Sequence, residues 1–143
     1  MKVRQISIFL ENRSGRLASV LKEVGRAEVN IRALSLADTS DFGILRLIVD
    51  DVDKCVKALR DTGHTVSLTE VLAVEVPDHP GGLAGILDVL SAADLNVEYM
   101  YAFVSRATEK ALVVFRFERI DAAIAALKKA GVSVVQAEKV YTL

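Results

Sequence analysis

The sequence contains few of the residues from which reactive or cross-linked sites are built. Among its 143 residues there are one cysteine, Cys55, and two histidines, His64 and His79. A single cysteine cannot form an internal disulfide, and these three residues do not make a set of zinc ligands. No Ser-His-Asp set, phosphate-binding loop or dinucleotide glycine motif is recognisable. The sequence therefore predicts no catalytic residues, no cofactor and no bound metal, and it argues against an enzyme.

The sequence also lacks a surplus of either charge and any long apolar run. Lysine and arginine total 18 against 19 for aspartate and glutamate, which gives a net charge of −1. No basic surplus is available to neutralise a nucleic-acid backbone. The first apolar run, residues 6–10, is ended by Glu11 and is too short for a signal peptide or a membrane span. We therefore expect a soluble, cytoplasmic protein that binds neither nucleic acids nor membranes.

The sequence does contain a repeat of about half its length. The pattern from Gly15 to Asn30 recurs from Gly81 to Asn96, and the pattern from Val52 to Val66 recurs from Ile120 to Val134. A repeat of this length is a small domain rather than a solenoid unit. We place the first domain at residues 1–69 and the second at residues 70–143. Each half is too small for a core that is stable alone, so we expect the halves to share a buried surface and the chain to form a homodimer.

Both halves have the same order of predicted elements. Apolar residues at helical spacing predict two helices in the first half, at Leu17, Val20, Leu21 and Val24 and at Val52, Cys55, Val56 and Leu59. Strands are expected at residues 3–10, 30–37, 42–49 and 65–68. The second half repeats this order and is expected to end with a strand at residues 132–137. The fold class is therefore α+β, with two ferredoxin-like βαββαβ units paired side by side, whose antiparallel sheets carry helices on one face.

The loop between the first strand and the first helix is the most informative segment of each half. Residues 10–15 are Leu-Glu-Asn-Arg-Ser-Gly, and the equivalent residues 76–81 are Val-Pro-Asp-His-Pro-Gly. Backbone N–H groups at a helix start suit a carboxylate, and the Asn12 amide can accept from an ammonium and donate to a carboxylate. Asn, Asp and Ser before a helix are more often caps, so spacing alone does not identify a binding site.

The order of elements, these two loops and the Asn30-Ile31 and Asn96-Val97 openings of the second strands resemble the ACT domain family. The resemblance covers essentially the whole chain, once in each half. ACT domains are small ligand-binding modules that regulate amino-acid metabolism. The first half is especially similar to the regulatory subunit of acetolactate synthase and to the serine-sensing domain of phosphoglycerate dehydrogenase. In those relatives the loop Asn and Gly and the strand-two Asn hold an amino acid across a domain–domain seam, which by position implicates Asn12, Gly15 and Asn30.

Departures from these relatives bear on the ligand. Leu10 stands where the serine-sensing relative has a histidine, which favours a ligand with an apolar or aromatic side chain. Asp78 stands where the first half has Asn12, so we expect binding in the first half rather than in the second. There the ligand carboxylate would lie over the N–H groups of Arg13 to Leu17. The candidate ligand-binding residues are Asn12, Arg13, Ser14, Gly15, Arg16, Leu17, Asn30, Ile31, Asp78, His79, Gly81 and Asn96.

Three aromatic residues distinguish the second half from the first. Tyr99, Tyr101 and Phe103 share one face of a strand, where the first half has only small residues. Such residues usually fill an interdomain or oligomer contact, and a wall for an aromatic ligand is the alternative. Two functions remain open. The first is a sensor that binds an amino acid at the seam between units and signals by changing their arrangement. The second is a ligand-free interaction module or regulatory subunit that docks onto a metabolic enzyme.

Overall fold

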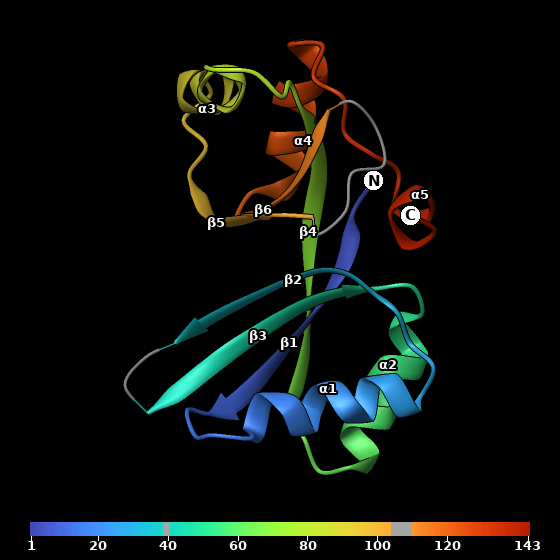
Figure 1. Cartoon of the computed structure of the whole chain (residues 1–143). Coiled ribbons are helices and arrows are strands. Elements are labelled where there is room, and N and C mark those ends of the chain that lie inside the picture. Colours follow the sequence, from blue (N-terminus) through green and yellow to red (C-terminus); the bar gives the residue numbers. More distant parts are fainter. Residues whose placement is uncertain (39–40, 104–109) are drawn as a thin grey trace.

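The computed structural model describes residues 1–38, 41–103 and 110–143 as two α/β units joined by one long strand (Figure 1). The expected α+β class is confirmed, with antiparallel strands and helices on one face of each unit. Its elements are β1 (Val3–Glu11), α1 (Arg16–Arg26), β2 (Ile31–Asp38), β3 (Phe42–Val49), α2 (Val52–Asp61), β4 (Val66–Val76), α3 (Gly82–Ala92), β5 (Val97–Ala102), β6 (Ala111–Phe117), α4 (Ile120–Lys129) and α5 (Ala137–Tyr141).

Strand β4 belongs to both units. The sheet has the order β2-β3-β1-β4-β6-β5. Along residues 66–71, β4 pairs with β1, and along residues 72–76 it pairs with β6. The boundary expected between residues 69 and 70 therefore falls inside a continuous strand. Because no linker separates the units, the hydrogen bonds of β4 fix their relative position.

Each unit has its own core between its helices and its part of the sheet. In the first unit, alternate residues of β1 and β3 pack against the apolar stripes of α1 and α2, and the second unit repeats this arrangement with β4, β6, α3 and α4. A third cluster, which includes Ala33, Ile48 and Val114, joins the helix-free faces of the two halves of the sheet. Figure 1 shows these faces turned toward each other, with α1, α2, α3 and α4 outermost and α5 beside the contact, to which it contributes Ala137 and Val140. The shared buried surface expected from the apolar composition lies here.

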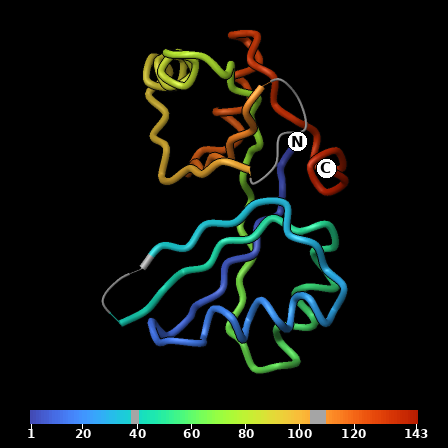
Figure 2. Tube along the Cα trace, in the orientation of Figure 1, coloured from blue at the N-terminus to red at the C-terminus, as the bar shows by residue number. Residues whose placement is uncertain are grey.

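The strand predicted at residues 132–137 is wrong. This segment makes one isolated bridge, between Val134 and Val74, and α5 begins at Ala137. The reason is that β1 already occupies the same edge of β4, where Val3 pairs with Val71. Residues 132–136 can therefore pair with β4 only at Val74, beyond the end of β1, and the chain then enters α5. As Figure 2 shows, the two ends of the chain lie close together, and the Arg4 N–H donates to the Tyr141 hydroxyl.

The buried thiol of Cys55 makes stability depend on alkaline pH. Burial in the first core, with smaller effects from the Asp50 and Asp51 carboxylates, raises the pKa of Cys55 from 9.0 to about 11. A group whose pKa is raised by folding stabilises the fold below its unfolded pKa and loses that contribution as pH rises. Urea unfolding between pH 9 and 11 should therefore show a steeper loss of stability in the wild type than in Cys55→Ala, which has the residue found at the equivalent Ala123. Parallel pH profiles would contradict this.

Candidate functional site

The β1–α1 loop of the first unit ends in a glycine at the start of its helix. Gly15 is the N-cap residue, so the N-cap has no side chain, and its φ of 87° lies in the left-handed region that favours glycine. By contrast, the Asp51 side chain accepts from the Lys54 N–H at the start of α2. The Asn12 N–H donates to the Asp41 carbonyl, which holds the loop against the β2–β3 hairpin. The N-cap position of α1 is therefore glycine rather than Asn12 or Ser14.

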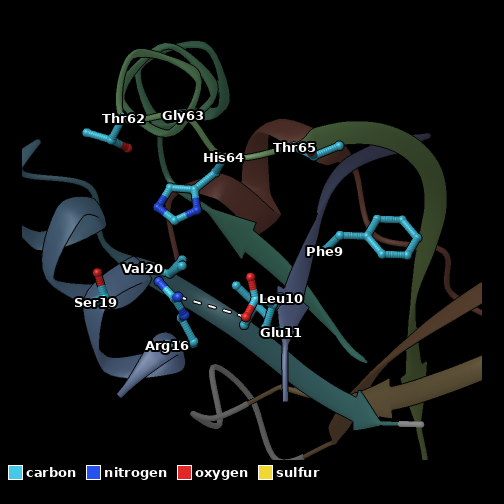
Figure 3. Close-up of a pocket in the computed structure, with 10 residues that line it drawn as sticks. All are labelled: Phe9, Leu10, Glu11, Arg16, Ser19, Val20, Thr62, Gly63, His64 and Thr65. Carbon is cyan, nitrogen blue, oxygen red and sulfur yellow. Dashed lines mark ion pairs between the residues drawn. The ribbon is translucent and has the colours of Figure 1, made fainter. Parts of the chain in front are cut away.

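A cavity of about 300 Å³ lies between this loop and the α2–β4 turn. Figure 3 shows the His64 ring and the Arg16 guanidinium both directed into the space beside Val20, from opposite walls. Glu11 pairs with Arg16 at 3.8 Å and with Arg13 at 3.2 Å. The complete lining is Phe9, Leu10, Glu11, Arg16, Ser19, Val20, Thr62, Gly63, His64 and Thr65.

The cavity therefore combines charges of both signs with an apolar floor. The side chains of Glu11 and Arg16 are each about half exposed, and ion pairs this exposed are worth only about 0–1 kcal/mol. They can exchange partners with a charged ligand at small cost. Leu10 and Val20 are buried in the first core and reach the cavity only with their edges.

The structure does not bring Asn30 and Ile31 to the loop of their own unit. They follow α1, whereas Asn12 precedes it, and a helix of 11 residues is about 16 Å long. The Asn30 N–H donates to the Asp50 carboxylate at 2.9 Å. Asn96 likewise follows α3, whereas the second loop precedes that helix. It lines a separate cavity of about 400 Å³ at the end of α3.

The loop of the second unit has a similar backbone but different side chains. Gly81 is the N-cap of α3 with a φ of 84°, so this N-cap also has no side chain. The exposed His79 folds back on its own loop, where its N–H donates to the Pro77 carbonyl and its Nδ1 lies 3.0 Å from the Pro80 carbonyl. Asp78 is also exposed. His79 therefore contacts its own loop rather than a ligand cavity among the described residues.

Tyr99, Tyr101 and Phe103 lie in the contact between the two units. The Gln5 side chain amide is fully buried there, donating to the Tyr99 hydroxyl at 2.7 Å and accepting from the Tyr101 hydroxyl. The guanidinium of Arg46 stacks 3.7 Å from the centre of the Tyr99 ring. Burial raises the pKa of Tyr101, so its hydroxyl remains a donor. Sequence reasoning missed Gln5, which lies in β1 between the charged Arg4 and the apolar Ile6.

Comparison with known proteins agrees with this architecture. The family model of the ACT domain pair matches residues 1–143. The chain belongs to the ACT domain pair family. A solved relative, protein BT0572 from Bacteroides thetaiotaomicron, shares 42% identity with a TM-score of 0.93, covering 100% of this chain and 98% of the other. No curated protein matches the sequence significantly.

More distant solved structures show the same fold. The ligand-free regulatory subunit of aspartate kinase from Thermus thermophilus has 17% identity and a TM-score of 0.63, covering 89% of this chain and 91% of that one. The corresponding subunit from Thermus flavus has 16% identity and a TM-score of 0.60, with coverages of 90% and 92%. Within residues 1–38, 41–103 and 110–143, no helix of this ACT domain pair is long and apolar enough to cross a membrane. The same described residues hold no group of three potential metal ligands.

The buried amide of Gln5 gives a test of the contact between the units. Tyr101→Phe removes the donor to the Gln5 Oε1 atom and should lower the free energy of unfolding by about 1–3 kcal/mol, the cost of an unsatisfied buried acceptor. Tyr99→Phe should cost less, because the Gln5 amide nitrogen also donates to the Ser7 hydroxyl at 3.3 Å. Urea unfolding of both variants checks this order, and a larger loss in Tyr99→Phe would contradict it.

Proposed function

We propose that this ACT domain pair is a non-enzymatic regulatory protein that binds an amino acid at the β1–α1 loop of its first unit. The cavity beside that loop carries the proposal, because Glu11 and Arg16 line it next to a helix start whose N-cap residue is glycine, and Arg13 pairs with Glu11. An amino acid carries one ammonium and one carboxylate, and the loop offers a partner for each. The apolar floor of Leu10 and Val20 supports an apolar side chain on the ligand.

The predicted loop residues fit this role. The backbone N–H groups from Arg13 to Leu17 suit a carboxylate, and Gly15 lets the backbone approach it. The Asn12 amide can hold the ammonium. Asn30 and Ile31 lie at the far end of α1, so they can join this site only from a second copy in a homodimer. We rank the second unit, with Asp78, His79, Gly81 and Asn96, below the first.

Signalling requires the ligand to favour one arrangement of the units or subunits over another. A ligand as small as an amino acid gains at most roughly 0.3–1.5 kcal/mol per heavy atom, so micromolar affinity is expected. The resemblance to regulatory subunits of amino-acid enzymes supports a partner enzyme. We place this protein in the cytoplasm, where the free thiol of Cys55 stays reduced. A closer likeness to acetolactate synthase or phosphoglycerate dehydrogenase regulators stays part of the proposal.

The second candidate function is an interaction module without a ligand. It is favoured by Phe9 and Phe42, which are each 55% exposed. They lie on the same face of paired strands as the contact between units, nearer the β2–β3 hairpin. Exposed apolar side chains that continue a buried contact are typical of protein-binding surfaces. Tyr99 and Tyr101, by contrast, already contact Gln5 within the chain.

Thermal unfolding in the presence of each proteinogenic amino acid tests the sensor. At about one hundred times its Kd, a true ligand should stabilise the fold by about 2.7 kcal/mol and raise the melting temperature. Asn12→Ala should reduce that rise, because the ligand ammonium loses a partner. Gln136→Ala, which removes an exposed amide far along the chain, should leave the rise unchanged. If no amino acid raises the melting temperature, the sensor proposal is wrong and the interaction module becomes the better explanation.

A further inference from the structure

The two units differ most in the chemistry of one cavity. In the first unit its polar lining includes Glu11, Arg16, Ser19 and His64. The equivalent positions of the second unit carry no hydrogen-bonding side chain, being Pro77, Gly82, Gly85 and Val132. Because the second unit forms the same fold without these groups, the fold does not require them.

In the second unit the loop packs tightly on the start of the helix at the position equivalent to Arg16. Gly82 is buried, and a Cβ atom there would lie 2.0 Å from the Pro77 carbonyl oxygen, so its loop packs directly on the start of α3. No side chain fits at Gly82 without movement of that backbone. At the equivalent position of the first unit, the Arg16 side chain extends into an open cavity (Figure 3). The open and charged form is therefore specific to the first unit.

The polar groups of the open cavity are complementary to an amino-acid zwitterion. Arg16 and Ser19 from α1 and His64 from the α2–β4 turn supply donors from two opposite walls. Both ion pairs of Glu11 end on its Oε2 atom, which leaves Oε1 to accept from an ammonium. The volume of about 300 Å³ is at the lower end of the range for ligand pockets, as a single amino acid needs.

We infer that the amino acid is bound inside this cavity within a single chain, where Arg16, Ser19 and His64 hold its carboxylate together with the loop N–H groups and Glu11 holds its ammonium together with Asn12. The inference rests on the proposed function and deepens it. The α2–β4 turn of the same unit, rather than Asn30 of a second copy, completes the site. The ligand side chain then faces Leu10 and Val20.

Isothermal titration calorimetry of the full chain with the proteinogenic amino acids tests this. For the amino acid that binds the wild type, Arg16→Gln and His64→Val should each weaken the affinity about 10- to 100-fold, the effect of losing one hydrogen bond to a charged group. Arg26→Gln removes an exposed arginine from the other end of α1 and serves as the control with unchanged affinity. The melting temperature of each ligand-free variant checks that it is folded.

The outcomes separate the two proposals. If no amino acid binds the wild type, the proposed function is wrong. If one binds and Asn30→Ala weakens it while Arg16→Gln and His64→Val do not, the sensor stands and the single-chain site is overturned in favour of the seam between copies.

An analogue without the amino group tests the orientation of the ligand. The desamino carboxylic acid of the bound amino acid should bind the wild type about 10- to 100-fold more weakly. Glu11→Gln should weaken binding of the amino acid but not of this analogue, because only the amino acid has an ammonium. Equal losses for both compounds would overturn the assignment of Glu11.

Discussion

The whole structure depends on the hydrogen bonding of one shared strand. Strand β4 pairs with β1 along its first half and with β6 along its second half, on opposite edges. Because β4 is one continuous strand that pairs with β1 in the first unit and with β6 in the second, its hydrogen bonds tie both units to the same backbone element. The same strand excludes a full final strand in the second unit, since the edge it would need is occupied by β1. The duplicated chain is thus a single body with two helical outer layers and a closed centre.

The centre of this body combines apolar packing with one polar contact. The cluster between the sheets is made of small and branched apolar side chains, such as Ala33 and Val114. Among them, the Gln5 amide meets two tyrosine hydroxyls from the opposite unit. A buried amide is tolerated only when its hydrogen bonds are made, so this contact restricts the units to arrangements in which Gln5 and the tyrosines stay paired. The contact therefore fixes the relative position of the two units, which are not independent domains joined by a flexible linker.

Most of the fold was predictable because its determinants are local. The spacing of apolar residues in α1 and α2 and their alternation in β1 and β3 indicate which face of each element is buried, independently of the element that packs on it. The error at residues 132–137 arose because strand pairing depends on which edges are free, a long-range property that no segment carries alone. Gln5 was missed for a related reason: its polar side chain is typical of a solvent-facing strand position, and only the second unit covers it.

The candidate site was predictable only in part. The chemistry of a helix start pointed to the loop residues from Asn12 to Leu17, of which Arg16 lines the cavity. Ser19 and His64 were missed, since one comes from the helix face and the other from a turn far along the sequence, and folding brings them to the same cavity. The repeat did contain a signal for His64, because the equivalent residue of the second half is the apolar Val132. A duplicated chain supplies its own reference, and positions such as Arg16 and His64, which are Gly82 and Val132 in the second copy, are the ones the proposal singles out.

The α2–β4 turn is directly connected to the strand that both units share. Residues 62–65 form one wall of the cavity, and β4 begins at Val66, directly after them. This wall is therefore joined to the sheet of the second unit by one continuous strand, with no linker in between. In the proposed function, β4 is the element through which binding beside the turn would change the second unit.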